Sequence, residues 1–347
     1  MTMRSAVLSP SLLLGLLAPC LLAPGLMAQE APSPSGPPPA STAPPPPASD
    51  DATTTLHENV NLVDVYFTAR DKQGFITNLA KSDCSIMEDK VPQTIKNFTQ
   101  EKKLPLTIGI LLDTSGSQQN VLPVEQQSAA EFLRDVLTPK DEAFLISFDI
   151  NVDLLADYTN RASEIKHALD KATINTGAGT GSVTGNGTPR GTLLYDAVFL
   201  AAHDKLSSEA GRKVMVILTD GEDQGSQETL KSATEAAQKA NVIVYVILIA
   251  DRGFYGGFGY SGDREMERMA TDTGGRVINV GNNGRKLEDA FAQIQDELRT
   301  QYLLSYTPTN SKADGTYRKL EMGCGKDLKV QTRKGYYAIA SVDTQGQ

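Results

Sequence analysis

The chain has 347 residues, of which 40% are hydrophobic, and a formal net charge of −9 at pH 7. This acidic balance, together with the lack of basic clusters in the sequence, argues against nucleic acid as a partner. The three histidines, His57, His167 and His203, are scattered without the spacing of metal ligands, so we expect each to be a surface or boundary residue.

Residues 1–28 have the layout of a secretory signal peptide, with an apolar stretch at 12–22 and a small residue, Ala28, before the expected cut. A membrane anchor would need about 20 uninterrupted apolar residues, and prolines interrupt this stretch. We therefore expect export to the periplasm, the cell surface or the medium, with no transmembrane segment in the mature chain. A lipoprotein cut at Cys20 is the weaker alternative, because Pro19 fits poorly before the modified cysteine.

We expect residues 29–55 to form a proline-rich linker. Nine of the 18 prolines lie between residues 29 and 51, with Ser, Ala and Thr among them. Such a segment cannot bury a core, so we expect a semi-extended polyproline spacer.

Two short-strand segments flank the middle of the chain. Residues 56–103 contain VNLVDVYFTARD, FITNLAKSDCSIMED and PQTIKNFTQ, which predict three or four β-strands. Residues 301–340 return to this pattern with QYLLSYTP, TYRKLEM and LKVQTRKGYYA, before a tail at 341–347. Neither segment alone has enough strands for a two-layer core. We favour their pairing into one small β-sandwich-like domain, with independent tails as the alternative.

Long apolar strands alternate with helical segments in residues 104–300. The predicted strands are 106–112, 142–148, 213–219, 242–249 and 276–280. The predicted helices are 124–137, 162–172, 192–207, 227–240, 264–271 and 286–301. Strands such as VMVIL and VIVYVILI are apolar on both faces, as in a parallel sheet that helices cover. The alternation predicts a doubly wound, Rossmann-like α/β domain with a mostly parallel sheet.

Oxygen-bearing side chains follow several of these strands. The first strand ends in Asp113-Thr114-Ser115-Gly116-Ser117, a carboxylate and two hydroxyls in one turn, and LTDGED places Asp220 at the end of another. Thr192 lies in GTLLYDA, at the start of a predicted helix. Each residue taken singly also suits a turn or a helix cap. Together, at the carboxyl ends of parallel strands, they predict a site for a hard divalent cation.

The charge of this set predicts what it would bind. Two aspartates balance one divalent cation and the hydroxyls add no charge, so the metal stays electrophilic enough to accept a carboxylate from an Asp or Glu of a protein partner. Asp196 and Asp223, close in sequence to the ligands, are candidates for supporting hydrogen bonds or are simply solvated.

The motifs DTSGS, GTLLYDA and LTDGED resemble, in type and order, those of the von Willebrand factor A domain with its metal-ion-dependent adhesion site. The resemblance implies that Ser115, Ser117 and Thr192 contact Mg²⁺ through hydroxyls, with Mn²⁺ or Ca²⁺ as alternatives. It also implies that Asp113 and Asp220 act directly or through water. The VNLVDVYFTARDKQG opening and the QYLLSYTP…RKGYY ending resemble an exported bacterial group of this family, largely acidobacterial.

Two glycine-rich loops are expected to frame the site. Residues 174–191 lead into Thr192, and a loop of this length is usually functional or mobile. Residues 250–262 carry four aromatic side chains that we interpret as a partner contact, with packing back onto the domain as the alternative. They are Phe254, Tyr255, Phe258 and Tyr260.

After signal cleavage two cysteines remain, Cys84 and Cys324, one in each short-strand segment. An even pair in an exported protein permits a disulfide, and such a bond would join the two segments directly.

We expect a non-enzymatic, exported, metal-dependent protein-binding or adhesion module. The alternative is a structural or assembly component of the cell envelope with a purely stabilising metal. A metal-dependent hydrolase is the least favoured hypothesis. The sequence offers no His or Lys base near the motifs, no G-x-S-x-G elbow, no P-loop and no catalytic cysteine context.

Overall fold

The computed structural model describes residues 62–101, 104–175, 191–249 and 262–339. Every described residue belongs to one compact unit, Glu58–Gln347. The predicted signal peptide, linker and tail lie outside the described residues. No helix within these four ranges is both long and apolar enough to cross a membrane.

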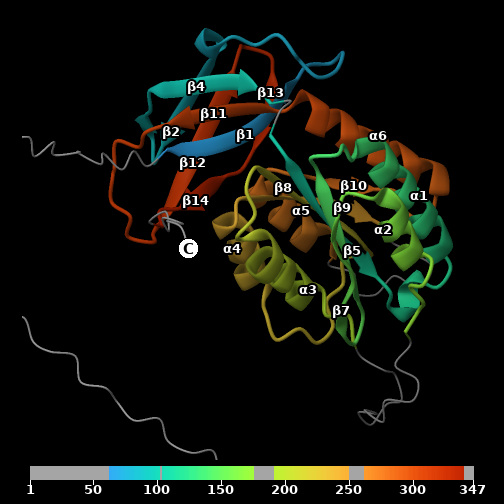
Figure 1. Cartoon of the computed structure of the whole chain (residues 1–347). Helices are drawn as coiled ribbons and strands as arrows, with labels where there is room; N and C mark the ends of the chain where they lie inside the picture. Colours follow the sequence, from blue (N-terminus) through green and yellow to red (C-terminus); the bar gives the residue numbers. More distant parts are fainter. Residues whose placement is uncertain (1–61, 102–103, 176–190, 250–261, 340–347) are drawn as a thin grey trace, which may run out of the picture. The chain divides into compact units, whose positions relative to one another are not determined.

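A six-stranded sheet forms the centre of the α/β part (Figure 1). In spatial order its strands are β10 (Val277–Asn279), β9 (Val242–Leu248), β8 (Arg212–Thr219), β5 (Leu106–Asp113), β6 (Glu142–Phe148) and β7 (Val152–Thr159). The first five are parallel to one another. β5, β8 and β9 are buried along their whole length, as their apolar runs predict for strands covered on both faces.

The edge strand β7 is not predicted by the sequence pattern. It runs antiparallel to β6, and their register is irregular between Ala143 and Ile146. Its residues vary between half-buried and exposed without a continuous apolar face. An edge strand of this kind lacks the regular alternation from which strands are predicted.

Helices cover both faces of the sheet (Figure 1). One face carries α1 (Leu122–Val136), α2 (Ala162–Leu169) and α6 (Gly284–Thr300), and the other carries α3 (Leu194–Leu200), α4 (Leu230–Lys239) and α5 (Gly262–Thr273). The two faces have separate hydrophobic cores. Ile108 and Ile110 of β5 pack in the core that contains Leu133 of α1, whereas Leu111 packs in the core that contains Met266 of α5. This division follows from the alternation of side chains along a strand.

Two helices begin later than predicted, and Thr192 lies outside both. The predicted helix 192–207 becomes α3, followed by a π-helical turn at Ala201–Leu206. α4 begins after Thr229, whose hydroxyl accepts a 3.1 Å hydrogen bond from the Ser232 N–H and caps the helix. The preceding N–H groups of residues 227 and 228 donate to the Asp196 carboxylate instead.

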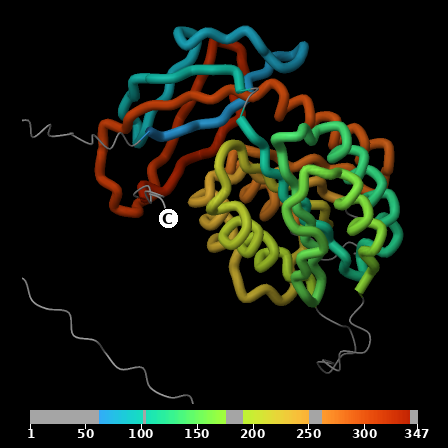
Figure 2. Tube along the Cα trace, viewed as in Figure 1, coloured from blue at the N-terminus to red at the C-terminus, as the bar shows by residue number. Residues whose placement is uncertain are grey.

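The flanking strands form two four-stranded antiparallel sheets, and each sheet combines strands from both sides of the α/β part. The first consists of β13 (Lys329–Thr332), β1 (Val63–Arg70), β11 (Tyr302–Tyr306) and β4 (Ile95–Gln100). The second consists of β14 (Gly335–Tyr337), β12 (Tyr317–Cys324), β2 (Cys84–Glu88) and β3 (Val91–Pro92). Residues of both sheets share one hydrophobic core. The blue N-terminal and red C-terminal strands accordingly lie together in Figure 2.

The α/β part is inserted between two paired strands of the first sheet. Gln100 of β4 is opposite Tyr302 of β11, and the next N–H, that of Glu101, donates to the Gln301 carbonyl at 2.8 Å. In the second sheet, Cys84 and Cys324 are directly opposite each other and form a disulfide. In the structure the flanks therefore form one composite β-domain rather than two independent tails.

Candidate metal centre

Asp113 ends β5 with its carboxylate fully buried and held from two sides. Its Oδ1 accepts a 3.0 Å hydrogen bond from the Ser115 N–H, and its Oδ2 accepts a 2.7 Å hydrogen bond from the Thr219 hydroxyl. α1 starts after Val121 without a side-chain cap. Asp113 and Ser117 therefore do not cap this helix, which removes the simplest alternative role for the motif.

The two motif serines lie in the turn that follows. Ser115 precedes a short 3₁₀ turn, Gly116–Gln118, and is buried, whereas Ser117 is half-buried. Their hydroxyl oxygens are 3.1 Å apart. Two hydroxyls at this separation can both turn toward one small cation.

Asp220 follows the end of β8, the neighbour of β5, and is also buried. Its Oδ1 accepts a 3.1 Å hydrogen bond from the Glu222 N–H. Gly221 has φ of +86°, a conformation that favours glycine. The first residue of α5 packs closely behind this turn, since a Cβ on Gly262 would lie 2.7 Å from the Gly221 carbonyl carbon and oxygen.

Thr192 joins this edge of the sheet through its backbone. Its N–H donates to the Gln224 carbonyl at 3.3 Å, and the Gln224 N–H donates back to the Thr192 carbonyl at 2.9 Å. The side chain is buried and lies two residues before α3. The segment with Thr192 is thus tied directly to the segment that follows Asp220.

Asp149 belongs to none of the three sequence motifs. It connects the turn at residues 113–117, the motif turn, to the segment that contains Thr192. Its Oδ2 accepts a 2.7 Å hydrogen bond from the Thr114 hydroxyl, and its Oδ1 accepts a 3.0 Å hydrogen bond from the Asn175 side-chain amide. Its carbonyl accepts from the Leu193 N–H at 2.8 Å. The available signal was its position directly after β6, at the same edge of the sheet.

Asp196 and Asp223 also support the loops. Oδ1 of Asp223 accepts from the Tyr195 N–H at 3.1 Å, and Oδ1 of Asp196 accepts from the Glu228 N–H at 2.8 Å. Each carboxylate therefore joins the segment that follows Thr192 to the segment that follows Asp220 through a backbone N–H. Neither has a hydrogen bond to a candidate ligand side chain among the described contacts.

The electrostatics of the site suit a cation. Burial, and then the nearby charge of Asp220, raise the pKa of Asp113 to about 7, against the opposing effect of its hydrogen bonds. Two buried carboxylates that repel each other, beside neutral hydroxyls, form a donor set that fits one divalent ion. In the part of the chain that the structure describes, no group of three or more His, Cys, Asp or Glu side chains could hold a metal. The hydroxyl donors would have to complete the set.

The four aromatic residues of the predicted partner loop lie outside the described residues: Phe254, Tyr255, Phe258 and Tyr260. Residues 176–190 of the other loop lie outside them as well. The residues that bracket the aromatic loop lie at the site: the Ile249 N–H donates to the Thr219 carbonyl at 2.8 Å, and Gly262 packs on the Asp220 turn.

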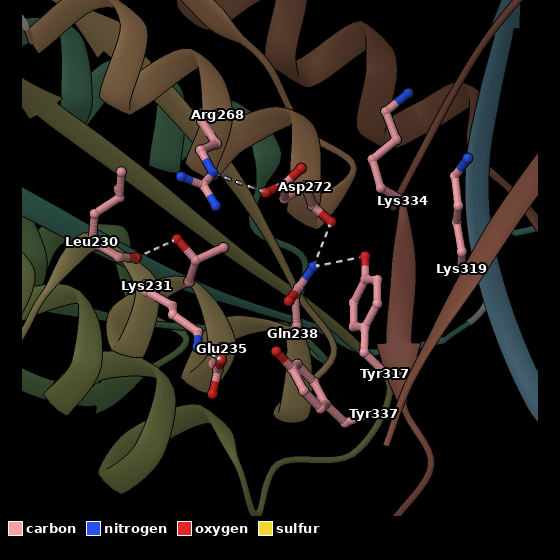
Figure 3. A pocket seen from close by; sticks show the side chains of 11 residues that line it. Leu230, Lys231, Glu235, Gln238, Arg268, Asp272, Tyr317, Lys319, Lys334 and Tyr337 are labelled. Atoms are coloured by element: carbon pink, nitrogen blue, oxygen red, sulfur yellow. Dashed lines mark hydrogen bonds and ion pairs between the residues drawn. The ribbon is translucent and has the colours of Figure 1, made fainter. Parts of the chain in front are cut away.

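A pocket of about 340 Å³ lies apart from these ligands, between α4, α5, β12 and β14 (Figure 3). Its lining includes Gln238, whose amide donates to the Asp272 carbonyl at 3.0 Å and to the Tyr317 hydroxyl at 3.5 Å. Two of its charged residues, Arg268 and Asp272, form an ion pair at 3.8 Å. None of the five candidate ligands lines this pocket.

Residues 107–293, more than half of the chain, match the von Willebrand factor type A domain. The chain belongs to this family. The parallel sheet with helices on both faces is the fold of the type A domain, and the composite β-domain is an addition from the flanks. No curated protein sequence matches the chain.

Several solved structures are similar to this type A domain protein. BatB from Bacteroides thetaiotaomicron is 19% identical over 56% of this chain and 99% of its own, with a TM-score of 0.43. Proximal thread matrix protein 1 from the mussel byssus has zinc in its metal-ion-dependent adhesion site (MIDAS) motif. It is 18% identical over 60% of this chain and 48% of its own, with a TM-score of 0.45. A mutant of the PilB minor pilin from Streptococcus sanguinis is 12% identical over 58% of this chain and 62% of its own, with a TM-score of 0.41.

Proposed function

We propose that this type A domain protein is a divalent-metal-dependent protein-binding module. Its metal would be held by Asp113, Ser115, Ser117, Thr192 and Asp220, and a partner carboxylate would complete the shell. The observation that carries the proposal is the pair of buried aspartates at the ends of the adjacent parallel strands β5 and β8, with three hydroxyl side chains in the loops around them.

The residues suit Mg²⁺, with Mn²⁺ and Ca²⁺ as alternatives, because carboxylate and hydroxyl oxygens are hard ligands. When bound, the cation would supply a Lewis-acidic position for one carboxylate oxygen. The protein's own part is to hold the donors. Thr219 and the Ser115 N–H fix Asp113, and the Glu222 N–H fixes Asp220.

A binding role is favoured over hydrolysis because, among the described residues, no histidine lies at the site to act as a base. The two described histidines are exposed, His167 on α2 and His203 on the π-helical turn, where it pairs with Asp204. The carboxylates of Asp113 and Asp220 are held by hydrogen bonds from the Ser115 N–H, the Thr219 hydroxyl and the Glu222 N–H. This arrangement suits recognition of an anion more than turnover.

Export is part of the proposal. The signal-peptide layout of residues 1–28 and the resemblance of the flanks to an exported bacterial group support a location in the periplasm, on the surface or outside the cell. A disulfide-linked β-domain suits such oxidising compartments.

A carboxylate probe tests whether the metal accepts an anionic ligand. Mn²⁺-loaded protein should enhance the relaxation of the acetate methyl protons, since bound acetate would lie beside the paramagnetic ion. Asp113→Ala should lose this enhancement, whereas the exposed Asp289→Ala control on α6 should retain it. Equal relaxation in all three proteins would contradict the proposal.

The second candidate is an envelope component with a purely stabilising metal. It predicts that Mg²⁺ raises the melting temperature of the protein while Mn²⁺-loaded protein leaves acetate relaxation unchanged. The melting and relaxation measurements on the same protein therefore separate the two functions.

A further inference from the structure

Glu125 is a buried acid close to the candidate ligands. It lies in the first turn of α1, directly after the motif turn, and is 0% exposed. Its Oε2 has no hydrogen-bond partner among the described residues. A core-facing position on a helix normally carries an apolar side chain, and an incompletely bonded buried carboxyl group is costly. This acid therefore needs an explanation.

Gln118 connects Glu125 to the second aspartate. It ends the 3₁₀ turn of the motif and is itself 0% exposed. With its amide nitrogen toward Glu125, it donates to Oε1 at 3.3 Å, and its oxygen accepts from the Asp220 N–H at 3.2 Å. The opposite orientation would place acceptor against acceptor and donor against donor, so the neighbours determine the orientation.

This chain of hydrogen bonds joins two halves of the ligand set. Gln118 belongs to the turn that carries Ser115 and Ser117, whereas the N–H that it binds belongs to Asp220 at the end of β8. Because Glu125 is anchored on α1, it can hold the Gln118 amide in one orientation. The contact requires no metal and so can set the spacing of the loops beforehand.

The electrostatic environment agrees with this geometry. Burial, followed by the charges of Asp113 and Asp220, raises the pKa of Glu125 well above its ordinary value. Glu125 therefore lies within the field of both candidate ligands rather than in an unrelated part of the core.

We propose that Glu125 and Gln118 are positioning residues of the metal centre, which fix the main chain of Asp220 against the motif turn before the cation binds. This inference rests on the proposed metal site. It adds two residues that no sequence motif identifies and assigns them a measurable effect on metal affinity.

The test is calorimetric titration of metal-free protein with Mn²⁺ and Mg²⁺. Gln118→Leu and Glu125→Ala should each weaken binding by about tenfold, the lower end of what supporting residues of metal sites contribute. Glu125→Gln should stay within about threefold of the wild type, because its amide oxygen still accepts from Gln118. Ser128→Ala, buried on the same helix, controls for disturbance of the α1 core and should leave affinity unchanged.

The outcomes separate the hypotheses. A merely structural role would lower the melting temperature of the metal-free protein in the alanine and leucine variants, while the folded protein kept its wild-type affinity. That result would overturn the positioning role. If Glu125→Ala does not fold, the comparison of Gln118→Leu with Glu125→Gln decides, and equal affinities contradict the proposal. If the wild type itself binds no divalent cation, the result contradicts the proposed metal site on which this inference rests.

Discussion

The Thr219 hydroxyl donates a 2.7 Å hydrogen bond to Oδ2 of Asp113, across 106 residues of sequence. The Thr219 hydroxyl oxygen also accepts a 3.0 Å hydrogen bond from the Gly221 N–H, so one buried hydroxyl contacts both Asp113 and the turn that follows Asp220. Asp220 lies between Thr219 and Gly221. The Asp113 carboxylate is thus tied to the main chain on both sides of Asp220.

Thr219→Val removes this hydroxyl with little change in shape. It leaves the Gly221 N–H without this acceptor and Asp113 without one donor, so we expect the free energy of unfolding to fall by about 1–3 kcal/mol. Mg²⁺ affinity should fall as well. Urea unfolding and metal titration of the same variant measure both effects, and wild-type values in both would show that the bond is incidental.

Asp149→Ala should loosen the motif turn and the Thr192 segment together. The variant loses the hydrogen bonds from Thr114 and Asn175, and we expect metal affinity to fall by about 10–100-fold. Asp153→Ala, an exposed acid on β7, is the matched control for the lost charge. Similar affinities in the two variants would mean that Asp149 acts only through net charge.

The stability of the metal-free protein should depend on pH. Because the pKa of Asp113 is raised from 3.8 to about 7, the folded state binds this proton more tightly than the unfolded chain does. Stability in chelator should therefore fall as pH rises from about 4 to about 7. Melting curves with chelator and with Mg²⁺ across this range should diverge as pH rises, and Asp113→Asn should remove the divergence.

The disulfide should stabilise the β-domain without affecting the metal site. Replacing Cys84 and Cys324 by serine should lower the free energy of unfolding by about 2–5 kcal/mol, the usual cost of losing such a bond. Metal affinity should be unchanged, because both cysteines lie in the strands β2 and β12. Two free thiols in the wild-type protein after alkylation without reductant would contradict the pairing.

The strands that are buried along their whole length can be predicted from the sequence. β5, β8 and β9 are apolar on both faces and were predicted within one or two residues, whereas β7 was missed because an exposed edge strand has no such signal. The five candidate ligands could be named because each belongs to a local motif at a strand end or before a helix.

The supporting residues could not be named in this way. Asp149, Thr219 and Gln118 act through contacts between segments that are distant in sequence, and only the folded chain brings these segments together. Glu125 resembles any acidic residue in the first turn of a helix, where a negative charge is favourable. Its burial depends on the way α1 packs against the sheet.

The central claim is that Asp113 and Asp220 help to hold one divalent cation. The most direct test is to titrate chelator-treated protein with Mn²⁺ and to monitor binding through the electron paramagnetic resonance signal of the free ion. We predict one saturable site per chain, lost in Asp113→Ala and in Asp220→Ala and retained in Asp289→Ala, with both aspartate variants still folded. No saturable binding by the wild type, or binding that survives both substitutions, would contradict the account.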